Sequence, residues 1–515
     1  MAADFYDLYC EAIKENEILR KENANLKMQI KSLTNRIAYL EKNQDKIIKK
    51  SVEKQVAKIT EAFEEKVISL EKQVDHLKGI LNNDSTNSGL STSKTPLNKN
   101  KHIPNSRVKS DKEKGGQLNH KKYKLSQFED SEITDIETHK IDVCPNCGSE
   151  MIETSNVKEK DELDFKIIVK KIRHRFIETI CPSCGNVAKV NIPVDLKEEN
   201  QYGKRVQALA LSLMNEGYVS MNRTKNIISG LTNDEINLSE GYIAKLQKRL
   251  SNNLVKFNQE LKREIIKLDI MHWDDTVIFV NKKRACLRFY GNNKVAYYTA
   301  HLKKDKDGID KDGILLALNT DTKVVHDHNM VNYNDDYKFI NVECVAHLLR
   351  DLHKCAENTQ HDWPKYMVSL LINANIERNG SGCVSDPEYV ESEYDIYVES
   401  GEEINEDDKN KYYHDEEKAL LKRLKKYKEN YLMWIYNADI PFTNNEAERS
   451  LRSSKTKMRV SGQFENIGGA ENFASIKSYI ETGKRHGMNS FDLIESALYG
   501  NYVTAEEMKN HDQAS

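Results

Sequence analysis

The stretch that decides the fold is IIKLDIMHWDDTVIFV, residues 265–280, an apolar run rich in β-forming residues with Asp274 near its centre. Two shorter runs follow it, RACLRFY at 284–290 and KVAYYTA at 294–300, and both have the length and alternation of β-strands. Together they predict a three-stranded meander whose first strand carries an acid.

The segments beyond the meander extend this pattern. The apolar patch GILLALNT, residues 313–320, has the length of a helix, and the β-branched run after it ends at Asp327. A further strand, NVECV at 341–345, leads into the helical sequence AHLLRDLHKCAE. Much later, a helix that begins near Asn444 carries Glu448. The predicted order is β-β-β-α-β, then another strand and helices.

Three acids therefore lie in three separate elements: Asp274, Asp327 and Glu448. Two divalent cations roughly 4 Å apart need carboxylates that converge from separate elements. Mg²⁺ and Mn²⁺ are hard ions that prefer such oxygen ligands. The pattern predicts a two-metal site for phosphodiester cleavage and strand transfer on DNA.

Four sequence blocks make this prediction specific: HDHNMVNY, ECVAHLLRDL, NNEAERSLR and KMRVSGQF. Together they resemble the insertion sequence 66 family of transposases, and the resemblance extends over nearly the whole chain. It implies a DDE transposase with an RNase H-like catalytic core, double-stranded DNA as transposon end and target, and small accessory proteins of the same element. The family's Asp-Glu-Thr block appears here as Asp274, Asp275 and Thr276. Asp274 is preferred as the metal ligand, with Asp275 as the alternative.

Basic residues follow Glu448 on the same predicted helix. They are Arg449, Arg452, Lys455, Lys457 and Arg459. Lys455 shares a helical face with Glu448 and could reach a phosphate beside the metals. The strip predicts DNA contact, and the alternative is a solvated basic face. His326 and His347 are candidates for roles that support the metal ligands or the structure, and they are left off the list of metal ligands.

Cysteine spacing gives a second strong signal. Cys144 and Cys147, and then Cys181 and Cys184, form two Cys-x-x-Cys-Gly knuckles that predict a structural zinc site with four thiolates. A pair of disulfides is the alternative. The sequence between the knuckles, DFKIIVKKIRHRFIETI, alternates like a hairpin strand. Its basic residues, predicted to contact DNA phosphates, are Lys166, Lys170, Arg173 and Arg175.

The amino-terminal part has a heptad pattern, with Leu19, Leu26 and Leu33 among the seam positions and Asn23 at an a-type position. It predicts a coiled coil that joins two or more copies of the chain, and two helices folded back as a hairpin are the alternative. Residues 83–125 are rich in Ser, Thr, Asn and Lys and predict a flexible basic linker.

Two further regions are predicted to be helical. Residues 196–264 form three helices that either read DNA as a helix-turn-helix or brace the core. Residues 358–440 exceed what an RNase H-like fold needs and predict a helical insertion interrupted by an acidic loop.

Length and composition fit this organisation. The 515 residues are too many for one core, and the net charge of −3 hides strong segregation of charge along the chain. The absence of a long apolar stretch and of a signal pattern predicts a cytoplasmic, nucleoid-associated protein without a membrane span. The predicted fold class is multidomain α+β. Its parts are the coiled coil (1–82), the linker (83–125), the zinc module (126–195), the helical domain (196–264), the first part of the core (265–357), the insertion (358–440) and the last part of the core (441–515).

Two functions from different classes remain open at this point. The favoured one is an active DNA transposase that cuts transposon ends and joins their 3′-hydroxyls to target DNA. The alternative is a non-catalytic DNA-binding protein or regulator derived from a transposase. Retention of all three acids favours the enzyme. A nuclease without strand transfer would use the same acids.

Overall fold

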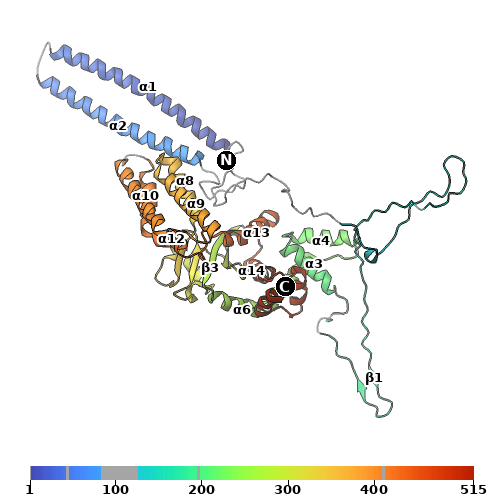
Figure 1. Cartoon of the computed structure of the whole chain (residues 1–515). Helices are drawn as coiled ribbons and strands as arrows, with labels where there is room; N and C mark the ends of the chain where they lie inside the picture. Colours follow the sequence, from blue (N-terminus) through green and yellow to red (C-terminus); the bar gives the residue numbers. More distant parts are fainter. Residues whose placement is uncertain are drawn as a thin grey trace. The chain divides into compact units, whose positions relative to one another are not determined.

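The computed structural model is a mixed α+β protein and mostly helical (Figure 1). It describes residues 2–41, 46–82, 126–154, 156–193, 196, 198–408 and 412–514. They form two compact units, of which the smaller consists of the described parts of Val108–Glu199 and Asn222–Glu240. No helix in the described ranges is long and apolar enough to cross a membrane.

A five-stranded mixed sheet is the centre of the larger unit. Its strands are β3 (Ile270–Val280), β4 (Lys283–Gly291), β5 (Ala296–His301), β6 (Lys323–His326) and β7 (Ile340–Glu343). The spatial order is β5-β4-β3-β6-β7. The first three strands form the antiparallel meander, and β6 and β7 add to β3 in parallel. The central strand is therefore the one that carries Asp274.

The segment between β5 and β6 differs from the prediction. The apolar patch 313–320 is not a helix: it contains only the 3₁₀ turn η3 (Leu315–Ala317), and the short helix α7 (Lys306–Asp310) precedes it. Gly313 has a φ of 59°, a left-handed conformation that a right-handed helix cannot include. Ile314, Leu315 and Leu318 of the patch are instead buried in the core from an irregular segment.

The helix α13 (Asn445–Ser461) packs on β3, and α14 (Ile467–Arg485) packs on the edge strand β5, whose Ala296 and Tyr298 N–H groups donate to Thr482 and Ser478 (Figure 1). The remaining helices that share this core are α3 (Lys204–Asn215), α5 (Glu240–Asn253), α6 (Val255–Ile266), α15 (Ser490–Ala497) and α16 (Ala505–Ala514). The long helix expected to end at about Ile266 is thus two helices, α5 and α6, which Leu254 separates with φ −90° and ψ 3°.

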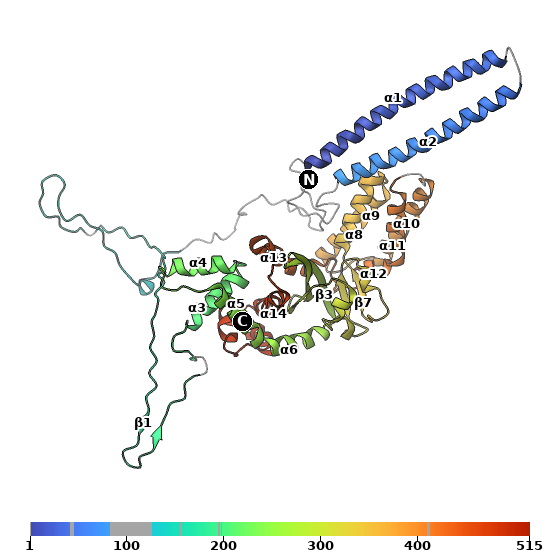
Figure 2. The same ribbon diagram turned by 180° about the vertical axis from the view of Figure 1, so that it is seen from behind.

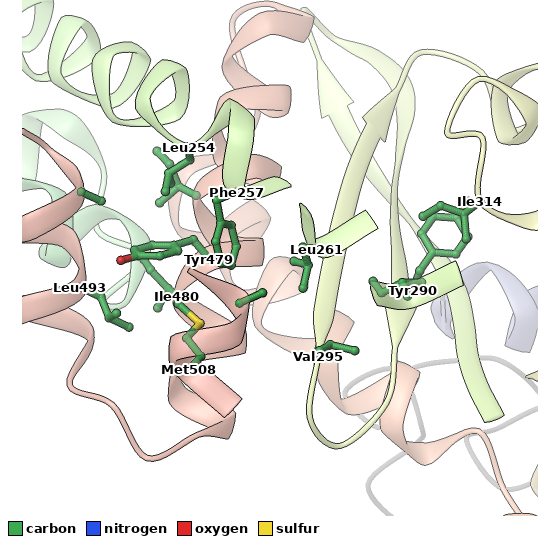
Figure 3. Packing of buried hydrophobic residues seen from close by; sticks show 14 of the residues in the cluster. Leu254, Phe257, Leu261, Tyr290, Val295, Ile314, Tyr479, Ile480, Leu493 and Met508 are labelled. Carbon is green, nitrogen blue, oxygen red and sulfur yellow. The ribbon is translucent and has the colours of Figure 1, made fainter. Parts of the chain in front are cut away.

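Aromatic and aliphatic side chains from distant segments meet in this core. Phe257 of α6 and Tyr479 of α14 are fully buried with ring centroids 4.8 Å apart, and Leu261 and Leu493 lie in the same cluster (Figure 3). Full burial of each such side chain contributes about 1.5–3 kcal/mol. This packing fixes α14, and α13 beside it, against the sheet.

The insertion is helical throughout its described part. It follows α8 (Val345–Thr359) and consists of α9 (Trp363–Ser381), α10 (Pro387–Asp407), α11 (His414–Lys426) and α12 (Lys428–Tyr436). The expected acidic loop is wrong, because the acidic residues lie on α10. This helix buries Val390, Tyr394, Val398 and Gly401 at spacings of three and four residues, so one apolar face packs while the acids stay in water.

The amino-terminal residues form two long helices, α1 (Ala2–Glu41) and α2 (Lys46–Asn82), that contact each other and lie side by side in both views (Figures 1 and 2). The predicted seam residues Leu19, Asn23, Leu26 and Leu33 are all half-buried. The arrangement corresponds to the hairpin alternative. The predicted basic linker, residues 83–125, lies outside the described residues.

The smaller unit has little regular structure. It contains η2 (Asp130–Glu132), the two-residue strands β1 (Thr179–Ile180) and β2 (Val187–Ala188), and α4 (Met221–Leu231) except for its first residue. The strand expected between the two cysteine pairs is present only as β1. Nearly all side chains from 164 to 178 are exposed, so no neighbouring strand buries the alternating apolar positions.

Candidate active site

Asp274 and Asp275 are adjacent on β3 but lie on opposite faces of the sheet, because successive strand residues alternate. Across the ladder, Asp274 is paired with Phe289 and Asp275 with Arg288. One carboxylate oxygen of Asp275 lies 2.6 Å from Lys304 Nζ, and the side chain of Asp275 is 6% exposed. Asp274 forms no ion pair within the described part of the chain. Lys304 therefore pairs directly with Asp275, while its charge acts on Asp274 only from a distance.

Asp327 follows the last residue of β6, which is paired in parallel with the first residues of β3. This pairing brings Asp327 near Asp274. The buried position of Asp274 and the negative charge of Asp327 raise the pKa of Asp274 to about 7. The two aspartates therefore form an acidic pair, and neither makes an ion pair with a described residue.

Glu448 is in the first turn of α13, the helix that packs on the Asp274 face of β3. Leu451, one turn further on, is buried in one cluster with Phe289, the cross-strand partner of Asp274. The carboxylate of Glu448 is 22% exposed, and Oε1 lies 3.8 Å from both His347 Nε2 and Arg350 Nη2. These two cations come from α8.

His347 lies close to both acidic groups. It contacts Glu448, and its charge also acts on Asp274, whose pKa it lowers. Burial opposes the protonation of His347, but its interactions with Cys344 and Glu448 outweigh burial and raise its pKa to about 9. At neutral pH His347 is therefore a cation that interacts with both Glu448 and Asp274.

The buried side chain of Asn444 joins three elements of the site. Its Oδ1 lies 2.9 Å from His272 Nδ1, and its Nδ2 donates to the carbonyl of Trp273 at 2.9 Å. Its backbone N–H donates to Cys344 Sγ at 3.1 Å. Asn444 thus attaches the start of α13 to β3 and to the residue that precedes α8.

Asp274 and Glu448 both interact with His347, but the three acids do not form one ligand set. Among the described residues, no three His, Cys, Asp or Glu side chains are arranged as a metal-binding group. The donor chemistry nevertheless fits a divalent cation, because Asp274 and Asp327 are close, bear carboxylate oxygens and form no ion pair with a described residue. Glu448 is held by His347 and Arg350 and would have to leave them to complete the set.

Four of the five cationic residues predicted on α13 are exposed: Arg449, Arg452, Lys455 and Arg459. Arg449 is paired with Glu446, one turn before it. The other three form no ion pair with a described residue, so their charges face water.

The prediction that Lys457 contacts DNA does not fit the position of its side chain. Its side chain is only 6% exposed, and Nζ lies 4.9 Å from the ring centroid of Phe473 and 5.6 Å from that of Phe464. Burial lowers the pKa of Lys457 to about 8. This lysine packs on aromatic rings under the helix, because it lies on the face that also presents Leu451 to the core.

The two cysteine knuckles have matching local geometry. Gly148 and Gly185 both have positive φ, 74° and 70°, and each donates its N–H to the first cysteine of its pair, at 2.9 Å and 2.8 Å. The described residues do not bring the two pairs into one group of four thiolates. The basic residues predicted between the pairs are Lys166, Lys170, Arg173 and Arg175, and all are exposed.

Sequence reasoning missed three residues of the site, Lys304, Arg350 and Asn444, and gave His347 only a supporting or structural role. His347 and Arg350 had a detectable signal, since in Cys-x-x-His-x-x-Arg they are three residues apart on one helix and so share a face. Asn444 is the first residue of the Asn-Asn-x-x-Glu-Arg block, but its side-chain contacts cross 171 or more sequence positions. Local pattern gives no indication of such contacts.

The fold and the site define a mixed α+β protein in which Asp274 on the central strand and a half-buried Asp327 after β6 lie near each other, and in which the helix that carries Glu448 packs on that strand. Residues 199–472 match the model of the Transposase IS66 family, and the match covers more than half of the chain. The chain belongs to this family. The matched region contains all three acids, and it supports a transposase-related function. Neither a curated protein nor a solved structure matches the chain.

Proposed function

We propose that this protein is a DNA transposase that cuts the ends of its element and transfers the new 3′-hydroxyls to target DNA. The observation that carries the proposal is the acidic pair of Asp274 and Asp327, which no described residue ion-pairs, near the helix of Glu448 and within a transposase family domain. A purely structural site would pair such buried carboxylates with cations, as the chain does for Asp275.

We further propose that the catalytic domain is RNase H-like. An antiparallel meander extended by parallel strands, with the acids on the central strand, after the fourth strand and on a late helix, is the arrangement expected of that fold. This assignment explains why the acids are far apart in sequence. Strand order and helix packing, rather than local sequence, bring them together.

Asp274, Asp327 and Glu448 would hold Mg²⁺ or Mn²⁺. Metal bound there would lower the pKa of the attacking hydroxyl and stabilise the leaving oxygen. Within the chain itself, Asn444 positions the helix of Glu448 on β3, and Lys304 keeps Asp275 out of the ligand set. His347 and Arg350 hold Glu448 near them, and Glu448 would leave them when it binds metal.

The exposed cations Arg452, Lys455 and Arg459 would bind the DNA backbone next to these acids. Phosphate contacts position a duplex without reading its sequence. The lysines and arginines between the cysteine pairs would add further contacts of the same kind, and Cys144, Cys147, Cys181 and Cys184 would hold structural Zn²⁺.

We also propose that the chain acts as a dimer or larger assembly, bound to double-stranded DNA in the nucleoid and aided by small accessory proteins of the same element. Joining two ends requires two placed active sites, and α1 and α2 offer an incompletely buried apolar seam for self-association.

The test is metal-dependent cleavage and joining of labelled DNA that carries the element's terminal repeats. Wild-type protein is compared with Asp274→Ala, Asp327→Ala and Glu448→Ala, with accessory proteins present. We expect all three variants to bind DNA and none to cut it. Cleavage by any of these variants at the wild-type rate would refute the assigned triad. Binding without cleavage by the wild type would favour the regulator.

A further inference from the structure

We propose a second DNA-backbone site on the turn between β3 and β4, formed by Lys282, Lys283 and Arg284. It rests on the proposed function and extends it, because it gives a path for the duplex beyond the three acids. The ligand is the phosphate backbone of double-stranded DNA, bound without regard to sequence.

The turn is attached to the chain that follows α13. Asn281 N–H donates to the carbonyl of Phe464 at 2.9 Å, and Phe464 N–H donates to the carbonyl of Phe279 at 2.8 Å. Gln463 Oε1 accepts from the Lys282 N–H at 2.6 Å. These bonds fix the turn beside the carboxyl end of the catalytic helix.

The charges on the turn are free. Lys282, Lys283 and Arg284 are exposed, and none of them pairs with an acid in the ranges that the structure describes. Between Ser450 and Asn466 the sequence contains one acid, Glu465, so the adjoining chain does not neutralise them.

The exposed cations of α13 lead from the active site toward this turn. Glu448, Arg452, Lys455 and Arg459 are spaced by four, three and four residues, which places them on one helical stripe. From Glu448 to Ser461, the last residue of α13, the helix extends roughly 20 Å at 1.5 Å per residue. That length matches roughly six base pairs of duplex at 3.4 Å per step. The turn therefore lies where a duplex that follows the helix would pass.

The backbone of the turn gives an independent indication. Asn281 and Lys282 both have positive φ, 45° and 62°, as a two-residue hairpin of this type requires. Glycine is the favoured residue at the second position, and lysine is strained there. Three consecutive cations at such a turn repel one another and contribute nothing to the core. A bound polyanion accounts for both features.

The decisive variant combines Lys282→Gly, Lys283→Thr and Arg284→Thr. Glycine relieves the left-handed strain and threonine suits a strand, so the fold is expected to be at least as stable as that of the wild type. The matched control removes three other exposed lysines on the insertion, Lys365→Ala, Lys422→Ala and Lys425→Ala, and changes the net charge by the same amount.

Full-length proteins are titrated with a random-sequence duplex of about 40 base pairs at several salt concentrations. Each lost phosphate contact lowers the slope of log K against log salt by about 0.9, so the turn variant should lose roughly 2–3 in slope and the control should lose none. An unchanged slope in the turn variant, with a wild type that binds and cuts terminal repeats, would overturn the turn site alone. A wild type that shows no salt-dependent DNA binding would overturn both the turn site and the proposed function.

A second measurement tests the position of the site. On terminal-repeat duplexes that end within about four base pairs of the cleavage point, the turn variant and the wild type should bind equally, because the duplex stops short of the turn. On longer duplexes the wild type should bind at least tenfold more tightly, about 1.4 kcal/mol. An equal difference on short and long duplexes would contradict the path along α13.

Discussion

At the scale of single residues, the site separates two adjacent aspartates by the face on which each lies. Asp274 faces α13 and Glu448, whereas Asp275 faces Lys304. We therefore expect Asp274→Asn to lower the cleavage rate by a factor on the order of 10³, since a metal ligand supplies several kcal/mol of transition-state stabilisation. Asp275→Asn should retain most of the activity. The measurement is the single-turnover cleavage rate of both variants, and the reverse ranking would exchange their roles.

Lys457 predicts a pH dependence of stability. Its folded pKa of about 8 lies below the ordinary value of 10.5, so between these values the unfolded chain binds a proton that the folded chain does not. Stability should rise as pH increases from 8 to 10.5, and the part due to Lys457 should be lost as pH falls through 8. Lys457→Met should therefore raise the free energy of unfolding at pH 7 by on the order of 1–2 kcal/mol and flatten its rise with pH. The gain is limited, because contacts of the ammonium with the aromatic rings offset part of the cost of its burial.

Urea unfolding of the wild type and Lys457→Met at pH 7 and at pH 10.5 measures this effect. DNA affinity serves as the control, since a buried ammonium should not contact phosphate and the substitution should leave the affinity unchanged. If Lys457→Met lost as much DNA affinity as Lys455→Ala, the original prediction that Lys457 contacts DNA would be supported instead.

At the scale of elements, α10 shows how an acidic helix packs. A methyl group on Gly401 would lie 2.6 Å from Leu421 Cδ2 and 3.0 Å from the ring of Trp363. Gly401→Ala should therefore destabilise the insertion by about 1–3 kcal/mol through overpacking. Gly380→Ala on α9 is the matched control, because nothing lies within 4 Å of the added carbon. It should be neutral or stabilising by up to about 1 kcal/mol. Equal thermal midpoints for the two variants would contradict this packing.

The elements also mark where sequence reasoning succeeds. Strands β3 to β7 were predictable, because β-branched and aromatic runs alternate and turn residues bound them. The helix α10 was missed because its acids hide the apolar residues that repeat every three or four positions. For the site, the acids follow from motif and spacing. Asn444 and Lys304 do not, since tertiary contacts alone give them their roles.

The cysteine knuckles lead to a prediction about metal removal. If the two pairs share one Zn²⁺, full-length protein should contain one zinc per chain, and Cys144→Ser should abolish it. Cys383→Ser is the matched control, because Cys383 is also an exposed thiol but lies on the other unit. The measurement is metal content after dialysis, with thermal unfolding before and after chelation. Zinc retained by Cys144→Ser would contradict a site with four thiolates.

At the scale of the whole molecule, the question is what covers the seam of α1 and α2. The seam residues remain half-buried after the two helices pair, so a second copy can bury them further. All three acids lie outside these helices. We therefore expect Leu26→Glu to convert a dimer into a monomer, because it introduces a charge into an apolar seam. Nicking of a single end should be retained and joining of two ends lost. Lys27→Glu, one position away and exposed, should remain dimeric. Sedimentation of both variants, with nicking and joining assayed in parallel, tests this expectation. A dimeric Leu26→Glu variant that joins two ends would mean that this seam serves only the hairpin, and that the active sites are paired elsewhere.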